Sequence, residues 1–387
     1  MPNTSDRSLT GLDPRTGKSI IVHYADGRIT AITAGAPGET AWLAPGLIDL
    51  QVNGYRGNDM NADDLTTDSV QCLARHMLSI GVTTFLPTLI TAPEQKIIHN
   101  LRMISATRHA DPLVAHIIPC VHVEGPHIAP EDGPRGAHPR EHVRPPDIAE
   151  FMRWQAASDD LVGMVTLSPH YALAPEYIRV LSARSIHISL GHTSATEDQI
   201  HSAAAAGARL CTHLGNGVAK LLPRHPNLIW AQLANDRLSA TFIADGYHLP
   251  ADTLTAMLRA KTVPRSILIS DLVTLAGLAP GEYVTPVGGR VDLHQDGRLN
   301  VAGSDYLAGA TATLKSAIAY IAANTGFSLG DAMRMATANP GSFVGNRGVL
   351  RVGASADLIR FRWEQGFSTL VIEEAVVQGK SWQSEVW

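Results

Sequence analysis

The sequence predicts an α/β protein: a (β/α)₈ TIM-like barrel with a small β-sandwich domain built from both ends of the chain. Eight short runs rich in apolar and β-branched residues alternate with helical segments, as the strands of a parallel sheet do. Four polar residues suited to catalysis each stand at the end of a different run. A barrel gathers such strand ends at one mouth, so these two patterns support the same fold.

The two ends of the chain, residues 1–44 and 345–387, are predicted to pair as the small β domain. They alternate short β-like stretches with turn signals such as Asp26-Gly27, and they lack long helical patterns. The predicted strands are 19–24, 29–33, 349–351, 357–362 and 369–378. Residues 45–344 then form the barrel.

The barrel elements follow one another along this middle segment. The predicted strands are 46–52, 83–89, 117–124, 162–169, 186–191, 209–213, 239–244 and 267–271. Amphipathic or alanine-rich helices separate most of them, several opened by Thr, Ser or Pro. The predicted helices are 65–80, 94–109, 196–206, 250–260, 312–323 and 329–338. Residues 129–146, rich in Pro, Gly, Arg and His, form a loop long enough to indicate a functional use.

Composition limits the possible partners. A chain of 387 residues with 45% hydrophobic content can bury a large core. A net charge of −5 excludes a broad basic surface for nucleic acid or an anionic membrane, although a local phosphate site remains compatible. No run approaches the roughly 18 apolar residues of a membrane span. Three scattered cysteines make no disulfide framework, so we expect a cytoplasmic protein.

The candidate metal ligands are Glu124, His192 and His213, at the ends of predicted strands three, five and six. One carboxylate and two imidazoles form a ligand set that suits zinc. Asp271 ends strand eight and is a candidate base for a metal-activated water. Its alternative role is to cap the next segment of the chain.

Other residues near these ends leave alternatives open. His122 and Cys211 each lie two positions before a candidate ligand, on the same side of the strand. At roughly 3.3 Å per residue they sit about 6 to 7 Å deeper, which favours packing inside the barrel over metal binding. His170, at the end of strand four, is a weaker candidate for the mouth.

Arg224 lies just beyond strand six, after the flexible stretch 214–217. A guanidinium group, together with backbone N–H groups and an Asn side chain, suits a phosphate monoester. A solvated loop arginine is the other interpretation, and sequence spacing does not choose between them.

Several motifs, in order and together, resemble those of the amidohydrolase superfamily, and within it the N-acetylglucosamine-6-phosphate deacetylases. The resemblance covers almost the whole chain. The motifs are APGLIDLQVNG (44–54), HVEGP (122–126), GAHP (136–139), GHTSAT (191–196), THLGNG (212–217), IADGYH (243–248), LAGAT (307–311) and ATANP (336–340).

The resemblance implies that Glu124, His192 and His213 hold one divalent metal ion per chain, with zinc expected, and that Asp271 is the acid and base. The substrate-binding residues that it implies are Ala137, His138, Asn216, Gly217, Arg224, His248, Leu307, Ala308, Gly309 and Ala310. Among them, His138 and His248 would contact the sugar and its acetamide, and Asn216 the phosphate end. Arg224 matches an arginine that reaches into a neighbouring subunit in the family, so a homodimer is implied.

Two features separate this chain from parts of the superfamily. Gln51-Val52-Asn53 stands where many members have His-x-His for a second metal ion. Amide side chains are poor zinc ligands, so we predict a single metal ion. The glycines on either side of Asn216, the stretch 218–220 and the stretch 270–272 also depart from the usual family pattern.

The implied activity is that of a hydrolase acting on a linear amide: N-acetylglucosamine 6-phosphate gives glucosamine 6-phosphate and acetate, in amino sugar catabolism. Because the departures lie near the implied sugar and phosphate pocket, two alternative substrates remain, N-acetylgalactosamine 6-phosphate and an N-acyl-D-amino acid. A non-catalytic binding barrel is a third hypothesis, but it gives no reason to retain three metal ligands together with Asp271.

Overall fold

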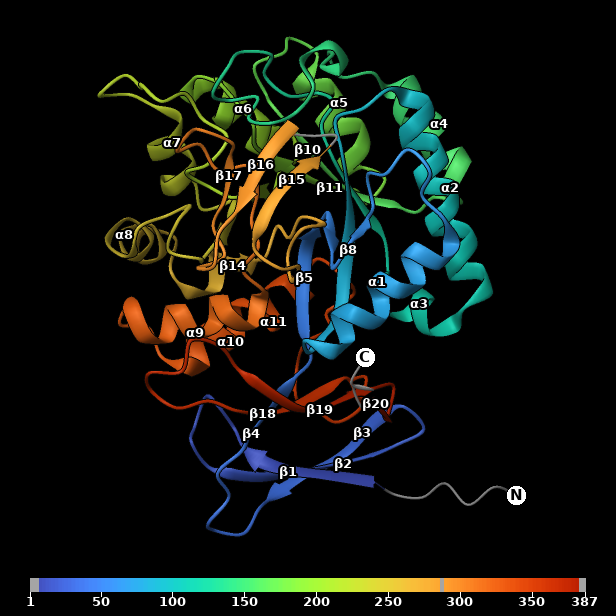
Figure 1. The fold of residues 1–387 in the computed structure, drawn as a ribbon, viewed down its shortest axis with the longest axis vertical. Coiled ribbons are helices and arrows are strands. Elements are labelled where there is room, and N and C mark those ends of the chain that lie inside the picture. The colour runs from blue at the N-terminus through green and yellow to red at the C-terminus, as the bar shows by residue number, and fades with distance from the viewer. Residues whose placement is uncertain (1–6, 286–288, 383–387) are drawn as a thin grey trace.

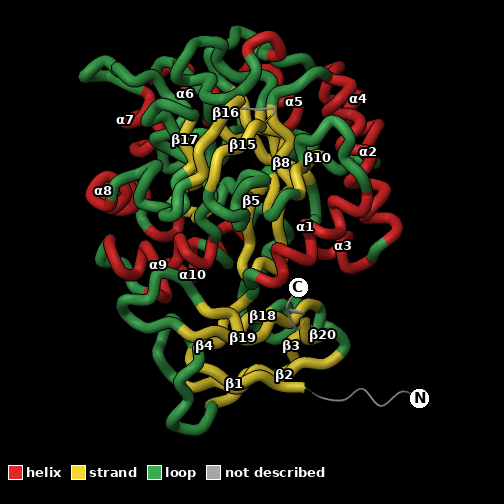
Figure 2. The backbone as a smooth tube through the Cα atoms, viewed as in Figure 1, coloured by secondary structure: helices red, strands yellow, loops and turns green. Residues whose placement is uncertain are grey.

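The computed structural model describes residues 7–285 and 289–382, so the outermost parts of the predicted small domain, 1–6 and 383–387, lie outside the described residues. A barrel surrounded by helices forms the larger part of the molecule, and a smaller sheet lies below it (Figure 1). Figure 2 shows the helices around the outside of the barrel strands, with strands and loops in the smaller part.

The barrel contains eight parallel strands in the order β14-β13-β12-β11-β10-β9-β8-β5 within the described chain. Their bounds are β5 Leu47–Val52, β8 Val82–Ile90, β9 Val121–Glu124, β10 Val162–Leu167, β11 His187–Leu190, β12 Leu210–Cys211, β13 Ser239–Ile243 and β14 Ser266–Ile269. A parallel bridge between Val52 and Leu272, and a hydrogen bond from the N–H of Asp271 to the carbonyl of Gln51 at 3.0 Å, join the two ends of the sheet. All eight predicted barrel strands are therefore confirmed, and with them the fold class.

Helices pack against the outside of the barrel strands because one face of each helix is apolar. In α1 (Thr67–Ser79), Val70, Leu73, Ala74 and Met77 follow the spacing of a single helix face and are buried, and the side chain of Thr66 caps the first turn. The other helices are α2 Glu94–Ala110, α3 Pro112–Ile117, α4 Ile148–Ser158, α5 Ala174–Ser182, α6 Glu197–Ala206, α7 Leu228–Ala234, α8 Ala251–Lys261, α9 Leu314–Asn324, α10 Leu329–Met335, α11 Ala338–Gly341 and the 3₁₀ turns Arg140–His142 and Val263–Arg265.

Five of these helices, α3, α4, α5, α7 and α11, are missing from the prediction. The predicted strand 117–124 is wrong at its start, because Ile117 ends helix α3 and the strand begins at Val121. The side chain of Asp111 accepts hydrogen bonds from the N–H groups of Leu113 and Val114, and this N-cap with Pro112 in the first turn starts a helix there.

The small domain is one mixed sheet of seven strands from both ends of the chain, in the order β20-β19-β18-β4-β1-β2-β3. The strands are β1 Arg7–Leu12, β2 Ser19–Ala25, β3 Arg28–Ala34, β4 Trp42–Pro45, β18 Leu358–Arg362, β19 Val371–Val377 and β20 Lys380–Trp382. β4 pairs in parallel with β1 and antiparallel with β18, so it joins the two halves.

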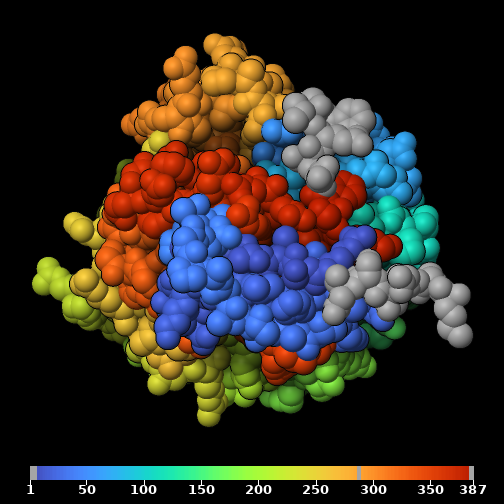
Figure 3. Space-filling view, turned by 90° about the horizontal axis from the view of Figure 1, so that it is seen from below, coloured from blue at the N-terminus to red at the C-terminus, as the bar shows by residue number. Residues whose placement is uncertain are grey.

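The two halves of the sheet pack on a shared core that includes Leu9, Val22, Leu43, Leu358 and Val376. Figure 3, seen from below, shows the N-terminal and C-terminal segments side by side on this face of the molecule. The predicted strand at 349–351 is wrong, since these residues form part of a loop.

A second small sheet follows the last barrel strand and was not predicted. It is antiparallel and contains β15 Gly281–Thr285, β16 Gly289–Leu293 and β17 Leu299–Val301, while β6 Gly54–Tyr55 and β7 Asn58–Asp59 form a short hairpin after β5. Among the described residues, the structure has no helix long and apolar enough to cross a membrane.

Candidate functional site

The four predicted catalytic residues meet at the C-terminal mouth of the barrel. Glu124 is the last residue of β9, while His192, His213 and Asp271 each follow two positions after the end of β11, β12 and β14. All four line one cavity of about 560 Å³. This placement agrees with the rule that barrel enzymes build their sites from strand C-termini.

Three of these residues have an unusual backbone conformation. His192, His213 and Asp271 have φ angles of 47°, 29° and 52°, in the left-handed region that non-glycine residues rarely adopt. Such conformations cost of order 1–3 kcal/mol each and cluster at functional sites. The backbone therefore turns just beyond the end of each of these strands, at a residue that lines the cavity.

Glu124, His192 and His213 form a buried group able to hold a metal ion. The Nε2 atoms of the two histidines are 3.1 Å apart, and the Oε1 atom of Glu124 lies 3.1 Å from His213 and 3.3 Å from His192. Ligands at about 2.0–2.1 Å from a tetrahedral ion lie about 3.3 Å from one another. The three side chains thus have the spacing and the donor types that a tetrahedral metal site requires.

The proton positions also suit metal binding. The Nδ1–H of His192 donates to the carbonyl of Pro134 at 2.9 Å, which leaves Nε2 with its lone pair toward the group. Burial opposes ionisation of Glu124, but the imidazoles of His192 and His213 outweigh it and hold the pKa of this carboxyl well below its usual range. Glu124 is consequently anionic, as a carboxylate that binds a metal ion has to be.

Gln51 connects the metal group to Asp271. Its Nε2 donates to Glu124 Oε1 and to Asp271 Oδ1, both at 3.0 Å, and Asn53 Nδ2 donates to the same Asp271 oxygen at 2.8 Å. Sequence reasoning interpreted Gln51 and Asn53 only as non-ligands. Their amides instead fix the orientation of both carboxylates.

Asp271 has the electrostatic setting of a proton acceptor near neutral pH. In the chain without a metal ion, burial raises the pKa of Asp271 to about 6, and the charge of Glu124 adds to the rise. His213, His248 and the hydrogen bond from Asn53 act in the opposite direction. A metal cation bound nearby would also lower the pKa of Asp271.

Two further histidines are oriented by polar partners. His138 Nδ1 lies 2.8 Å from Thr91 Oγ1, and burial lowers the pKa of His138 to about 3, so this ring is neutral. His248 Nδ1 lies 2.6 Å from Asp245 Oδ2, which leaves its Nε2 for the cavity. Thr91 and Asp245 were not predicted, although Asp245 stands three residues before His248 in a quoted motif.

Comparison with known proteins places this site in a family. The profile of the amidohydrolase family matches residues 42–381. The chain belongs to the amidohydrolase family. It is 32% identical to the N-acetylglucosamine-6-phosphate deacetylase of Vibrio furnissii over 341 residues, which cover 87% of this chain and 82% of that protein. It is 33% identical to the N-acetylgalactosamine-6-phosphate deacetylase of Escherichia coli O157:H7, over 85% of this chain and 86% of the relative.

Solved structures agree with this placement. A variant of the N-acetyl-D-glucosamine-6-phosphate deacetylase of Mycobacterium smegmatis, in complex with N-acetyl-D-glucosamine-6-phosphate, superposes with a TM-score of 0.86 at 27% identity. The superposition covers 97% of this chain and 99% of the other.

Most of the implied substrate residues of this amidohydrolase line the cavity. These are Ala137, His138, Asn216, Gly217, His248, Leu307, Ala308 and Gly309. Ala310 is absent from the lining and is buried in a core cluster. Arg224 is exposed and also lies outside the lining, whereas Lys220, which sequence reasoning did not select, contributes a cation to it.

The structure confirms that His122 and Cys211 are packing residues of the amidohydrolase. The ring nitrogens of His122 contact the carbonyl of Leu50 at 3.1 Å and Thr166 Oγ1 at 2.8 Å, inside the barrel. Cys211 is buried in the main hydrophobic core. The ring of His170 packs at a tilt against that of Tyr171, and His170 does not line the cavity.

Proposed function

We propose that this amidohydrolase removes the acetyl group of N-acetylglucosamine 6-phosphate and releases acetate and glucosamine 6-phosphate. The observation that carries the proposal is the buried Glu124–His192–His213 group beside Asp271, in a cavity large enough for a sugar phosphate. The similarity to deacetylases of this substrate along most of the chain supports it.

The metal that we propose is zinc, one ion per chain, held by Glu124, His192 and His213. When bound, it supplies a Lewis acid for the amide carbonyl and lowers the pKa of water. Iron, manganese and cobalt accept the same ligand set, so metal analysis of the purified protein tests this assignment. A purified chain with two metal ions, or with none, contradicts it.

The side chains of the site then move the protons. Asp271, ionised and held by Gln51 and Asn53, accepts the proton of the attacking water and returns it to the leaving amine. His138 is neutral, and with Nδ1 accepting from the hydroxyl of Thr91 its Nε2–H is free to donate to the developing oxyanion.

The phosphate end of the substrate requires positive charge. Lys220 supplies it from within the chain, next to Asn216 and Gly217 in the cavity lining. Arg224 is exposed, and so are Leu221 and Trp230, three and six positions from it in the sequence. We therefore assign Arg224 to the cavity of a partner subunit in a cytoplasmic homodimer, which light scattering and an Arg224→Ala variant would test.

N-acetylgalactosamine 6-phosphate is the second candidate substrate. The relative from Escherichia coli O157:H7, which is named an N-acetylgalactosamine-6-phosphate deacetylase, is 33% identical to this chain. The relatives named N-acetylglucosamine-6-phosphate deacetylase are similar to this chain to the same degree. The departures around Asn216 also lie in the lining of the cavity.

The deciding experiment measures acetate release by metal-counted protein from both epimers and from unphosphorylated N-acetylglucosamine. Turnover of N-acetylglucosamine 6-phosphate with about one metal per chain is expected. Preference for the galactosamine epimer would change the substrate and keep the chemistry. No turnover of any of the three by metal-loaded protein would overturn the proposed function.

The role of Asp271 is tested by Asp271→Asn. Loss of the proton acceptor should lower kcat by about 10²–10⁴-fold. The metal content should stay near that of the wild type, because Asp271 is outside the three-residue metal group. Wild-type kcat in the variant would contradict this role.

A further inference from the structure

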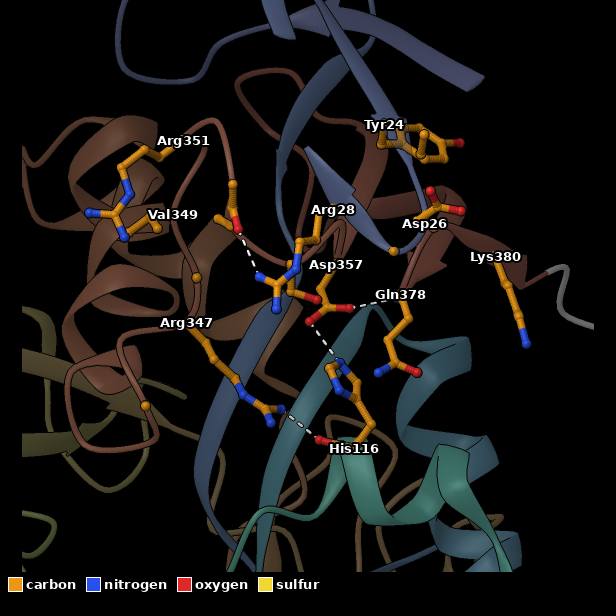
Figure 4. A pocket seen from close by; sticks show the side chains of 18 of the residues that line it. Tyr24, Asp26, Arg28, His116, Arg347, Val349, Arg351, Asp357, Gln378 and Lys380 are labelled. Carbon is orange, nitrogen blue, oxygen red and sulfur yellow. Dashed lines mark hydrogen bonds and ion pairs between the residues drawn. The ribbon is translucent and has the colours of Figure 1, made fainter. Parts of the chain in front are cut away.

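A second cavity, of about 920 Å³, lies at the other end of the molecule, between the small sheet and the N-terminal end of the barrel (Figure 4). Its walls come from the β2–β3 turn at Asp26, the loop 345–355 and the β19–β20 turn at Gln378, with His116 of α3 on the barrel side. We call it the basic cleft.

Positive charge dominates the basic cleft. Five cationic side chains line it, Arg7, Arg28, Arg347, Arg351 and Lys380. Against them stand two carboxylates, Asp26 and Asp357, so the arginines and the lysine exceed the carboxylates of the cleft by three charges. The whole chain has a net charge of −5, so this excess is a local feature opposite in sign to that of the protein.

The carboxylates of the cleft do not neutralise these cations by direct pairing. Asp357 accepts hydrogen bonds from His116 Nε2 at 2.9 Å and from the N–H of Gln378 at 2.8 Å. Within residues 7–285 and 289–382, none of the five cationic side chains forms an ion pair with a carboxylate. Elsewhere in the chain many arginines do, as Arg144 does with Glu150 and Arg360 with Glu373.

Two of the guanidinium groups are held in place by the walls. Arg28 Nη1 donates to the carbonyl of Gly353 at 2.9 Å. Arg347 Nη1 donates to the carbonyl of His116 at 2.6 Å and to Thr84 Oγ1 at 3.2 Å. Figure 4 shows both side chains directed toward the middle of the cleft, Arg28 from the start of β3 and Arg347 from the loop 345–355, with Lys380 at one edge. Groups fixed in this way lose less conformational entropy when they bind an anion.

We propose that the basic cleft binds a compact small molecule that carries two or more phosphoryl charges, of which pyrophosphate is the simplest. Guanidinium groups bind phosphate oxygens through paired, charge-assisted hydrogen bonds. The volume lies within the range of small-molecule pockets. Tyr24, the aromatic residue of the lining, is buried and only 4% exposed, so it offers little surface for stacking a nucleotide base.

The test is calorimetric titration of the metal-loaded protein with pyrophosphate in magnesium-free buffer, with ATP as a second probe. Arg28→Gln removes a charge from the middle of the cleft but keeps a side-chain donor for Gly353. Lys380→Gln removes a charge at its edge, where the ammonium group has no hydrogen bond or ion pair in the described structure. Each substitution should weaken pyrophosphate binding about tenfold, the effect of losing one charge-assisted contact.

Arg15→Gln is the matched control, because Arg15 is exposed in the same small domain and lies outside the cleft lining. It should leave pyrophosphate affinity unchanged, and all three variants should keep the wild-type thermal midpoint. Equal weakening in Arg15→Gln would show a general charge effect, and unchanged affinity in both cleft variants would place binding elsewhere. Either result, or no pyrophosphate binding by the wild type, would overturn the proposal. Tighter binding of ATP than of pyrophosphate would contradict the choice of a compact ligand.

Discussion

At the scale of single residues, Gln51 stands out because one amide serves two carboxylates. Its Nε2 group donates both to Glu124 of the metal group and to Asp271. Each carboxylate is thereby held in a fixed orientation. Gln51, which we predict not to bind a metal ion itself, thus supports the orientation of a residue in the metal group.

We predict that Gln51→Met, which keeps the volume and removes the donor, lowers metal affinity about 10–100-fold, as loss of outer hydrogen bonds typically does. kcat should fall as well, since Asp271 loses one of its two amide donors. Competition with a metal-binding dye measures the affinity. Unchanged metal affinity and kcat would show that this hydrogen-bond network contributes neither to metal binding nor to catalysis.

Lys220 tests the proposed phosphate end of the cavity. Lys220→Met should raise KM for the phosphorylated substrate about tenfold with little change in kcat, because it removes binding common to the ground state and the transition state. Any slow turnover of unphosphorylated N-acetylglucosamine should not change. Lys18→Met, at an exposed position outside the cavity, is the control. A similar KM effect on both substrates would exclude a phosphate contact.

At the scale of elements, helix α6 follows directly after the loop that carries His192. The side chain of Thr196 accepts from the N–H of Gln199, and the side chain of Gln199 accepts from the N–H of Thr196, which forms a capping box. This cap fixes where the loop ends and the helix begins.

Thr196→Ala should therefore destabilise the protein by about 0.5–2 kcal/mol, the usual effect of losing an N-cap. Thr196→Ser keeps the hydroxyl and should stay close to the wild type. Urea unfolding followed by circular dichroism measures both. Equal stability of the alanine and serine variants would mean that this cap has no energetic role.

The elements that sequence reasoning recovered are those with strong local signals. β8 is rich in apolar and β-branched residues, β14 contains the apolar run 267–269, and α6 carries its own cap, so each was predicted close to its observed bounds. α3 was missed because Ile117 and Ile118 extend an apolar run into the next strand, and such a run does not distinguish a buried helix from a strand.

The residues of the candidate site were likewise predicted only in part. Metal ligands at strand ends follow from the fold, so Glu124, His192 and His213 could be selected from sequence. Gln51 and Lys220 depend on tertiary placement: the first bridges residues 73 and 220 positions away, and the second reaches the cavity through an irregular loop. No local pattern encodes such contacts.

At the scale of the whole molecule, Asp357 ties the small sheet to the barrel. It accepts from His116 of α3, and the N–H of Gly46, at the start of the barrel, donates to its backbone carbonyl. Burial opposes ionisation of Asp357, but the hydrogen bonds from His116 and Gln378 outweigh it, so its pKa lies below the usual value.

A folded-state pKa below that of the unfolded chain stabilises the protein above the unfolded pKa of about 3.9. That stabilisation disappears as the pH falls through the lower, folded value. Asp357→Asn should cost about 1–3 kcal/mol at neutral pH, with a smaller difference from the wild type in acid. Asp26→Asn, in an exposed turn of the same sheet, should change stability by less than about 0.5 kcal/mol. A pH-independent difference would assign the effect to packing.

The joining of the two chain ends in one sheet also has a consequence for synthesis on the ribosome. β4 ends at Pro45, and its partner β18 begins at Leu358, about 310 residues later. Because synthesis adds about 5–20 residues per second, β4 lacks this partner strand for about 15–60 s, and its edge stays unpaired during that time. Throughout that interval the nascent chain exposes unpaired backbone groups and the apolar face of a half-built sheet. This is the period in which a chaperone or a second nascent copy has access to them.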